Sequence, residues 1–137
     1  KYLINKNFNS LHSRICISKT DMTKNLTTTG IIKENEAIHF CKLHNLTLLK
    51  PDKMNEINLI NTIYNCKTFV VSWGTSFFKN FIYLSDKCDR IIVLIYSKAF
   101  INQYNGRSNL YKNFFENKKI KVTYLIVDNI MDLKIDI

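Results

Sequence analysis

Residues 68–76 read Thr68-Phe69-Val70-Val71-Ser72-Trp73-Gly74-Thr75-Ser76, and this stretch decides the fold that we expect. Its first four residues are β-branched or aromatic, which is typical of a buried strand. Ser72-Trp73-Gly74 ends the apolar run, and Thr75 or Ser76 is a good N-cap for a helix. Such a strand–turn–helix unit presents backbone N–H groups that bind a phosphate or diphosphate, although many turns of this kind bind nothing.

Further strands and helices are expected on both sides of this stretch. The expected strands lie at 14–18, 46–49, 68–71, 90–96 and 121–127, and the expected helices at 33–44, 54–65, 75–84 and 109–117. Strands alternate with helices, and the central strands are continuously apolar. This pattern predicts an α/β domain with a doubly wound, mostly parallel sheet, in which ligands bind at the carboxyl ends of the strands.

The helix expected over 54–65 has an apolar face at helical spacing. Met54, Ile57, Ile60 and Tyr64 recur along this face, Leu59 and Ile63 widen it, and we expect the face to pack against the sheet. Residues 1–13 are polar, and we interpret them as a linker or the remnant of a preceding domain. The α/β lobe itself is expected to cover residues 14–137.

Composition and charge restrict the possible functions. The chain has 137 residues, 46% of them hydrophobic and 23% charged, which suits one globular domain. Its net charge is +9, but the basic residues are mostly lysines spread over the whole chain. A solvated lysine-rich surface is therefore favoured over a nucleic-acid interface, and no apolar run approaches the ~20 residues of a membrane span.

The cysteines bear on the compartment. Cys16, Cys41, Cys66 and Cys88 are widely spaced and form no CxxC motif. Buried free thiols in a reducing compartment are favoured over disulfides, which indicates a cytoplasmic protein. The sequons at 25–27 and 45–47 leave the lumen of the endoplasmic reticulum or Golgi as an alternative.

The ordered set of segments from about 14 to 96 resembles the C-terminal catalytic lobe of glycosyltransferase family 61. The family pattern has a strand ending in Ser-Arg, an Asn-Glu pair that opens a helix, a short strand ending near Pro, and a His-Gly-Ala/Ser-x-x-x-Asn loop. The corresponding residues are Ser18-Lys19, Asn35-Glu36, Leu46 to Pro51, and Trp73-Gly74-Thr75-Ser76-Phe77-Phe78-Lys79-Asn80. Trp73 replaces the usual His and Lys19 the usual Arg, which puts a His-dependent step in doubt.

The resemblance implies a Rossmann-like lobe of a GT-B-type enzyme. It implies an inverting hexosyl- or pentosyltransferase that takes a nucleoside-diphosphate sugar as donor and needs neither a metal nor another cofactor. The acceptor would be a glycan or glycoprotein, and a missing N-terminal lobe or a partner chain would hold it. The alternatives are a non-catalytic nucleotide-sugar-binding module and, less favoured, a basic nucleic-acid-binding domain.

The resemblance also implies a set of donor-binding residues. They are Lys19, Asn35, Glu36, Ser72, Trp73, Gly74, Thr75, Ser76 and Asn80. For Asn35 and Glu36 helix capping is an equal explanation, and for Asn80 the alternative is an exposed residue beside a helix cap. The sequence identifies no catalytic base, and His39 and His44 do not share a helix face as a metal pair would.

Overall fold

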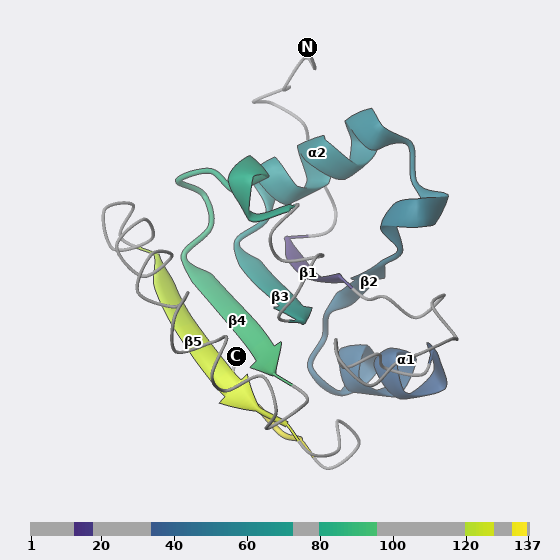
Figure 1. Cartoon of the computed structure of the whole chain (residues 1–137), viewed down its shortest axis with the longest axis vertical. Coiled ribbons are helices and arrows are strands. Elements are labelled where there is room, and N and C mark those ends of the chain that lie inside the picture. Colours follow the sequence, from purple (N-terminus) through teal and green to yellow (C-terminus); the bar gives the residue numbers. More distant parts are fainter. Residues whose placement is uncertain (1–12, 18–33, 73–79, 96–119, 128–132, 137) are drawn as a thin grey trace.

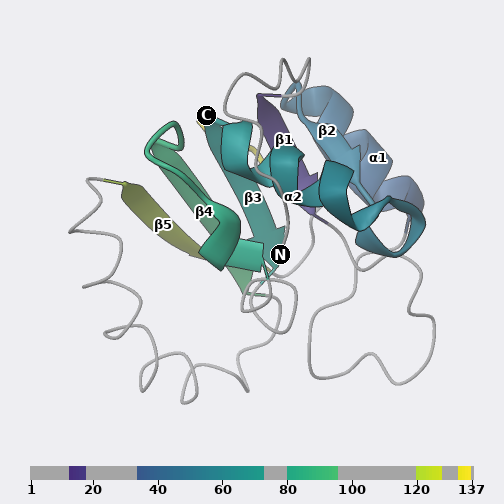
Figure 2. The ribbon, with the colours of Figure 1, turned by 90° about the horizontal axis from the view of Figure 1, so that it is seen from above.

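Five parallel strands form one sheet in the order β2-β1-β3-β4-β5 (Figure 1). The chain is represented by a computed structural model that describes residues 13–17, 34–72, 80–95, 120–127 and 133–136. Its elements are β1 (Arg14–Ile17), α1 (Glu34–Leu43), β2 (Thr47–Leu49), η1 (Pro51–Lys53), α2 (Glu56–Asn65), β3 (Thr68–Ser72), η2 (Phe81–Tyr83), β4 (Arg90–Ile95) and β5 (Lys121–Ile126). Figure 2 shows the labelled strands side by side from β5 to β2.

The strand register follows from apolar residues that are buried on both faces. Val71 of β3 lies between Ile17 of β1 and Val93 of β4, and all three are at most 1% exposed. Continuously apolar strands of this kind are stable only where helices cover both faces of a parallel sheet. The structure thus confirms the expected α/β architecture with a parallel sheet.

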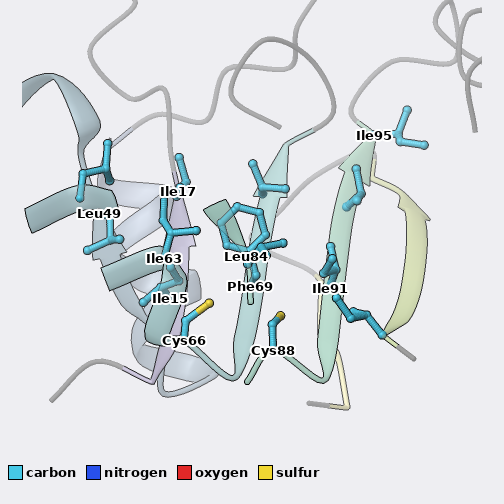
Figure 3. Close-up of a cluster of buried hydrophobic side chains, with 14 residues drawn as sticks. Ile15, Ile17, Leu49, Ile63, Cys66, Phe69, Leu84, Cys88, Ile91 and Ile95 are labelled. Carbon is cyan, nitrogen blue, oxygen red and sulfur yellow. The ribbon is translucent and has the colours of Figure 1, made fainter. Parts of the chain in front are cut away.

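The two longer helices cover opposite faces. Phe40 of α1 is buried in one apolar cluster with Val70 and Leu94. Ile63 of α2 is buried in a second cluster with Phe69, the residue before Val70 in β3, as Figure 3 shows. Because successive side chains of a strand point to opposite faces, Phe69 and Val70 identify the α2 face and the α1 face of the sheet.

Hydrogen bonds of backbone groups and of Arg14 fix the C-terminus of α1. Asn45 has a φ of 54°, the left-handed conformation that asparagine tolerates best after glycine. The Leu46 N–H donates to the Cys41 carbonyl at 2.8 Å and the Asn45 N–H to the Lys42 carbonyl at 3.4 Å, which is the Schellman arrangement. Arg14 of β1 donates from its guanidinium to the His44 and Asn45 carbonyls at 2.9 and 3.2 Å, so the end of α1 is tied to the start of β1.

The helix expected over 54–65 differs at its start and on its face. It begins at Glu56, because the side chain of Asn55 accepts the Ile57 and Asn58 N–H groups as an N-cap. The prediction that Ile57 packs against the sheet is wrong, since its side chain is 48% exposed. The five consecutive residues 59–63 are buried, so this part of α2 is covered on all sides, whereas Ile57 lies in the first turn, where residues 56–58 are all exposed.

The other elements agree with the expected ones to within a residue or two, except near residue 80. Asn80 is helical and residues 81–83 form a 3-10 turn, whereas Leu84 lies beyond the helical part. Residues 75–79 and the helix expected over 109–117 lie outside the described residues.

Candidate functional site

The strand order creates a switch point between β1 and β3. The chain leaves the carboxyl end of β1 toward α1 and β2 on one side, and it leaves β3 toward η2 and β4 on the other. The clusters show that α1 packs on one face of the sheet, while Phe81 and Tyr83 of η2 pack on the opposite face. In open parallel sheets the connections diverge at such a point, and the crevice outside the strand ends is where ligands bind.

Ser72 is a predicted site residue that lies directly beside the switch point. It is the last residue of β3 and pairs in register with Leu94 of β4. The strand that was expected to end at Val71 therefore extends by one residue, because the ladder to β4 continues through Ser72. Its side chain is 3% exposed and, by alternation with Val70, lies on the α1 face at the carboxyl end of the sheet.

Asn35 and Glu36 lie in the first turn of α1. The C-terminus of α1 is held at the amino end of β1 by Arg14, so its N-terminus points to the carboxyl end of the sheet. Asn35 is exposed, and its Oδ1 accepts the Glu36 N–H at 3.0 Å. This bond satisfies one N–H group of the first turn. Glu36 is half-buried.

Asn80 is buried rather than exposed. Its relative exposure is 7%, and it makes an interaction within the protein. The alternative of an exposed Asn80 is therefore wrong. The residues that follow it, Phe81 and Tyr83, pack on the α2 face, so Asn80 and the Asn35–Glu36 pair belong to elements on opposite faces of the sheet.

The remaining candidates lie outside the described residues. They are Lys19, Trp73, Gly74, Thr75 and Ser76. Lys19 is two residues beyond the end of β1, and Trp73 follows directly on the end of β3. The chain segments that hold these candidates therefore start at the two strands that flank the switch point.

A second group of charged residues lies at the amino ends of the strands, on the side of the sheet opposite the switch-point crevice. Arg90 and Lys121 begin β4 and β5 and are register partners, and Lys67 precedes β3. Basic residues at the starts of neighbouring strands are visible in the sequence, and the strand register brings Arg90 and Lys121 side by side. Arg14 belongs to the same edge, and its guanidinium binds the end of α1.

The described residues hold no cluster of three or more His, Cys, Asp or Glu side chains that could bind a metal ion. His39 is exposed, whereas His44 is buried and hydrogen bonded on both ring nitrogens.

Within the described residues, no helix has the length and apolar character needed to span a membrane.

Comparison with protein-family models, with curated proteins and with solved structures finds no match for this chain.

Proposed function

We propose that this chain is the Rossmann-like donor-binding lobe of a glycosyltransferase with a GT-B-type fold. It would bind a nucleoside-diphosphate sugar and transfer the sugar to a glycan or glycoprotein. The single observation that supports this proposal is the switch point between β1 and β3, because both strands continue directly into the segments that contain the candidate residues. A diphosphate in that crevice would lie outside the carboxyl ends of the strands, where parallel sheets bind nucleotides.

The mechanism that we propose is electrostatic. Backbone amides at Gly74, Thr75 and Ser76 would stabilise the negative charge on the departing diphosphate, and Lys19 would neutralise part of it. Asn35 and Glu36 would contact hydroxyl groups of the ribose or the sugar. The acceptor hydroxyl needs a general base, which we assign to the second lobe or to a partner chain.

The resemblance to family 61 supports the proposal through the order of its segments. The strand from 14, the Asn35-Glu36 pair at the start of α1 and the strand ending at Ser72 occur in the order of the family pattern. The first and third of these are neighbours in the sheet. A non-catalytic module that binds the same ligand is the second candidate, and the replacement of the usual His by Trp73 favours it.

The test is a calorimetric titration of the chain with nucleoside diphosphates and their sugar conjugates. Binding of one nucleoside diphosphate supports the proposal, and the variant Gly74→Val should lose at least tenfold in affinity because a Cβ would block the approach of the phosphate. Lys19→Ala should weaken binding, while the matched control Lys42→Ala, in the last turn of α1, should not.

An unchanged affinity in a folded Gly74→Val protein contradicts the proposed site. Sugar transfer by the chain together with the second lobe or partner chain that the proposal requires separates the two candidates, because the non-catalytic module binds the donor without turnover. A short oligonucleotide that binds with a steep salt dependence would instead favour the nucleic-acid alternative.

A further inference from the structure

The described structure brings the cysteines together in pairs. Cys66 and Cys88 belong to the apolar cluster on the α2 face, and Cys16 and Cys41 to the cluster on the α1 face. In each pair the two thiols are close enough to shift each other's pKa. The structure confirms the prediction of buried free thiols, but their pairing could not be predicted from spacings of more than twenty residues.

The Cys66–Cys88 pair has the geometry of neighbouring parallel strands. Thr68 of β3 and Arg90 of β4 are register partners, and the two cysteines each lie two positions before them. The strand pairing extends toward the cysteines, because the Asp89 N–H donates to the Lys67 carbonyl at 3.0 Å. Adjacent strands lie about 4.8 Å apart, and a disulfide needs its Cα atoms about 4.4–6.8 Å apart.

The two side chains lie side by side at one end of the cluster, as Figure 3 shows. The Cys88 thiol donates to the Arg90 carbonyl at 3.5 Å, which places Cys88 at the start of β4. Both thiols thus lie at the amino ends of neighbouring strands, at a backbone spacing that a disulfide allows.

We propose that Cys66 and Cys88 are a disulfide site, which is oxidised by exchange with a small-molecule or protein disulfide. The Cys88 thiolate attacks the disulfide reagent, forms a mixed disulfide and releases one thiolate. Cys66 then loses its proton to solvent and attacks the Cys88 sulfur, which releases the second thiolate. The two cysteines are oxidised by two electrons and the reagent disulfide is reduced to two thiols.

The order of these steps follows from access. Cys88 lies between the exposed Lys87 and Asp89 in the turn that opens, whereas Cys66 follows α2 and is fully buried. The neighbouring Cys66 thiol lowers the pKa of Cys88, although burial acts in the opposite direction, which favours the same order. Cys88 is therefore the thiol that attacks first.

Access to the pair requires opening of the turn before β4. Cys66 is fully buried and Cys88 is 2% exposed, but Lys87 and Asp89 on either side of Cys88 are exposed. The turn is held by the Cys88 N–H, which donates to the Ser85 carbonyl at 3.0 Å, and by the Ser85 hydroxyl, which donates to the Tyr64 carbonyl at 2.5 Å. Oxidation is thus expected during folding or when this turn opens.

The cross-link would close the segment 66–88. This segment contains β3, the candidate residues 72–76 and η2, so the disulfide would tie together both ends of the stretch that carries most of the candidate site. Formation of the bond itself does not depend on the proposed function.

The test is to unfold the reduced protein and refold it in a glutathione redox buffer. Free thiols are then alkylated, and the peptides are mapped by mass spectrometry. Four cysteines allow three fully paired connectivities, and only one of them joins Cys66 to Cys88. The proposal predicts a Cys66–Cys88 peptide, whereas alkylated Cys66 and Cys88, or links from either one to Cys16 or Cys41, would overturn it.

A double variant isolates the effect on stability. The Cys16→Ser, Cys41→Ser protein retains only the proposed pair, and its oxidation should raise Tm by roughly 10 °C because the closed loop restricts the unfolded chain. The reciprocal variant Cys66→Ser, Cys88→Ser should show no such rise from that pair. If either variant fails to fold, the peptide map of the unsubstituted chain decides the question alone.

Discussion

His44 provides the prediction that the structure defines most closely. Its Nε2 accepts the Ile135 N–H at 2.9 Å, and its Nδ1 lies 3.0 Å from the Phe40 carbonyl. Because Nε2 is an acceptor, the neutral ring carries its proton on Nδ1 and donates it to that carbonyl. The ring also lies against Phe40, with centroids 4.4 Å apart, so His44 fastens the segment 133–136 to α1.

The variant His44→Phe retains an aromatic ring at this position and removes both side-chain hydrogen bonds. The Phe40 carbonyl keeps the His44 backbone N–H as a donor, so its loss is limited to about 1 kcal/mol. The Ile135 N–H loses its acceptor in a part-buried place, which costs about 1–3 kcal/mol. The more apolar ring offsets part of this, and we expect a net loss of about 2 kcal/mol in the free energy of unfolding.

Urea unfolding of three variants, each compared with the unsubstituted chain, measures this loss. His39→Phe is the matched control, because His39 is exposed on the same helix and should change stability by less than about 0.5 kcal/mol. His44→Gln should recover part of the loss, since its amide oxygen can accept the Ile135 N–H. A loss in His44→Phe no larger than in His39→Phe, with unchanged hydrogen exchange at Ile135, would refute this account of the contact.

Two further predictions concern stability. Asn55→Ala removes the cap that accepts the Ile57 N–H at 2.9 Å, and it should cost about 1 kcal/mol in urea unfolding, whereas Asn55→Asp should cost little; equal losses in both variants would contradict the cap. The raised pKa of Cys66 predicts that reduced protein loses stability as pH rises above about 8.5, because the unfolded thiol ionises there and the folded one keeps its proton. Cys88, whose pKa is lowered, acts in the opposite sense, so the slope of the pair is at most about 1.4 kcal/mol per pH unit. The reduced double variant Cys66→Ala, Cys88→Ala removes both thiols and should lose less stability between pH 9 and 10 than the reduced parent; equal losses would show that the pair keeps no extra proton.

Much of the sheet could be predicted because its strands are continuously apolar. The strand at 90–95 and the strand at 68–72 contain the fully buried Ile91 and Phe69, and no helical pattern competes there. The exposure of Ile57 could not be predicted from its spacing, because the spacing does not show that the first turn of the helix, residues 56–58, lies outside the packed part. The helix starts at Glu56 because Asn55 caps it, and the apolar pattern carries no information on that start.

The candidate site could be predicted less fully. Ser72 reads as a polar break, yet in the structure the ladder to Leu94 continues through it, because backbone pairing does not depend on side-chain polarity. The sequence does not predict that Asn80 is buried, because an asparagine becomes buried only when tertiary partners satisfy its amide. The contacts of His44 and of the cysteine pairs join residues far apart in the chain, and no local pattern encodes them.

The most direct test of the proposed function is NMR mapping of the amide groups during titration with a nucleoside diphosphate. The account predicts that the largest shifts occur at the carboxyl ends of the strands, at Ile17 and Ser72, and at Asn35 in the first turn of α1. The amides of Arg90 and Lys121 at the opposite edge should change little. Shifts concentrated at Arg90 and Lys121 instead, with Ile17 and Ser72 unmoved, would contradict a donor site at the switch point.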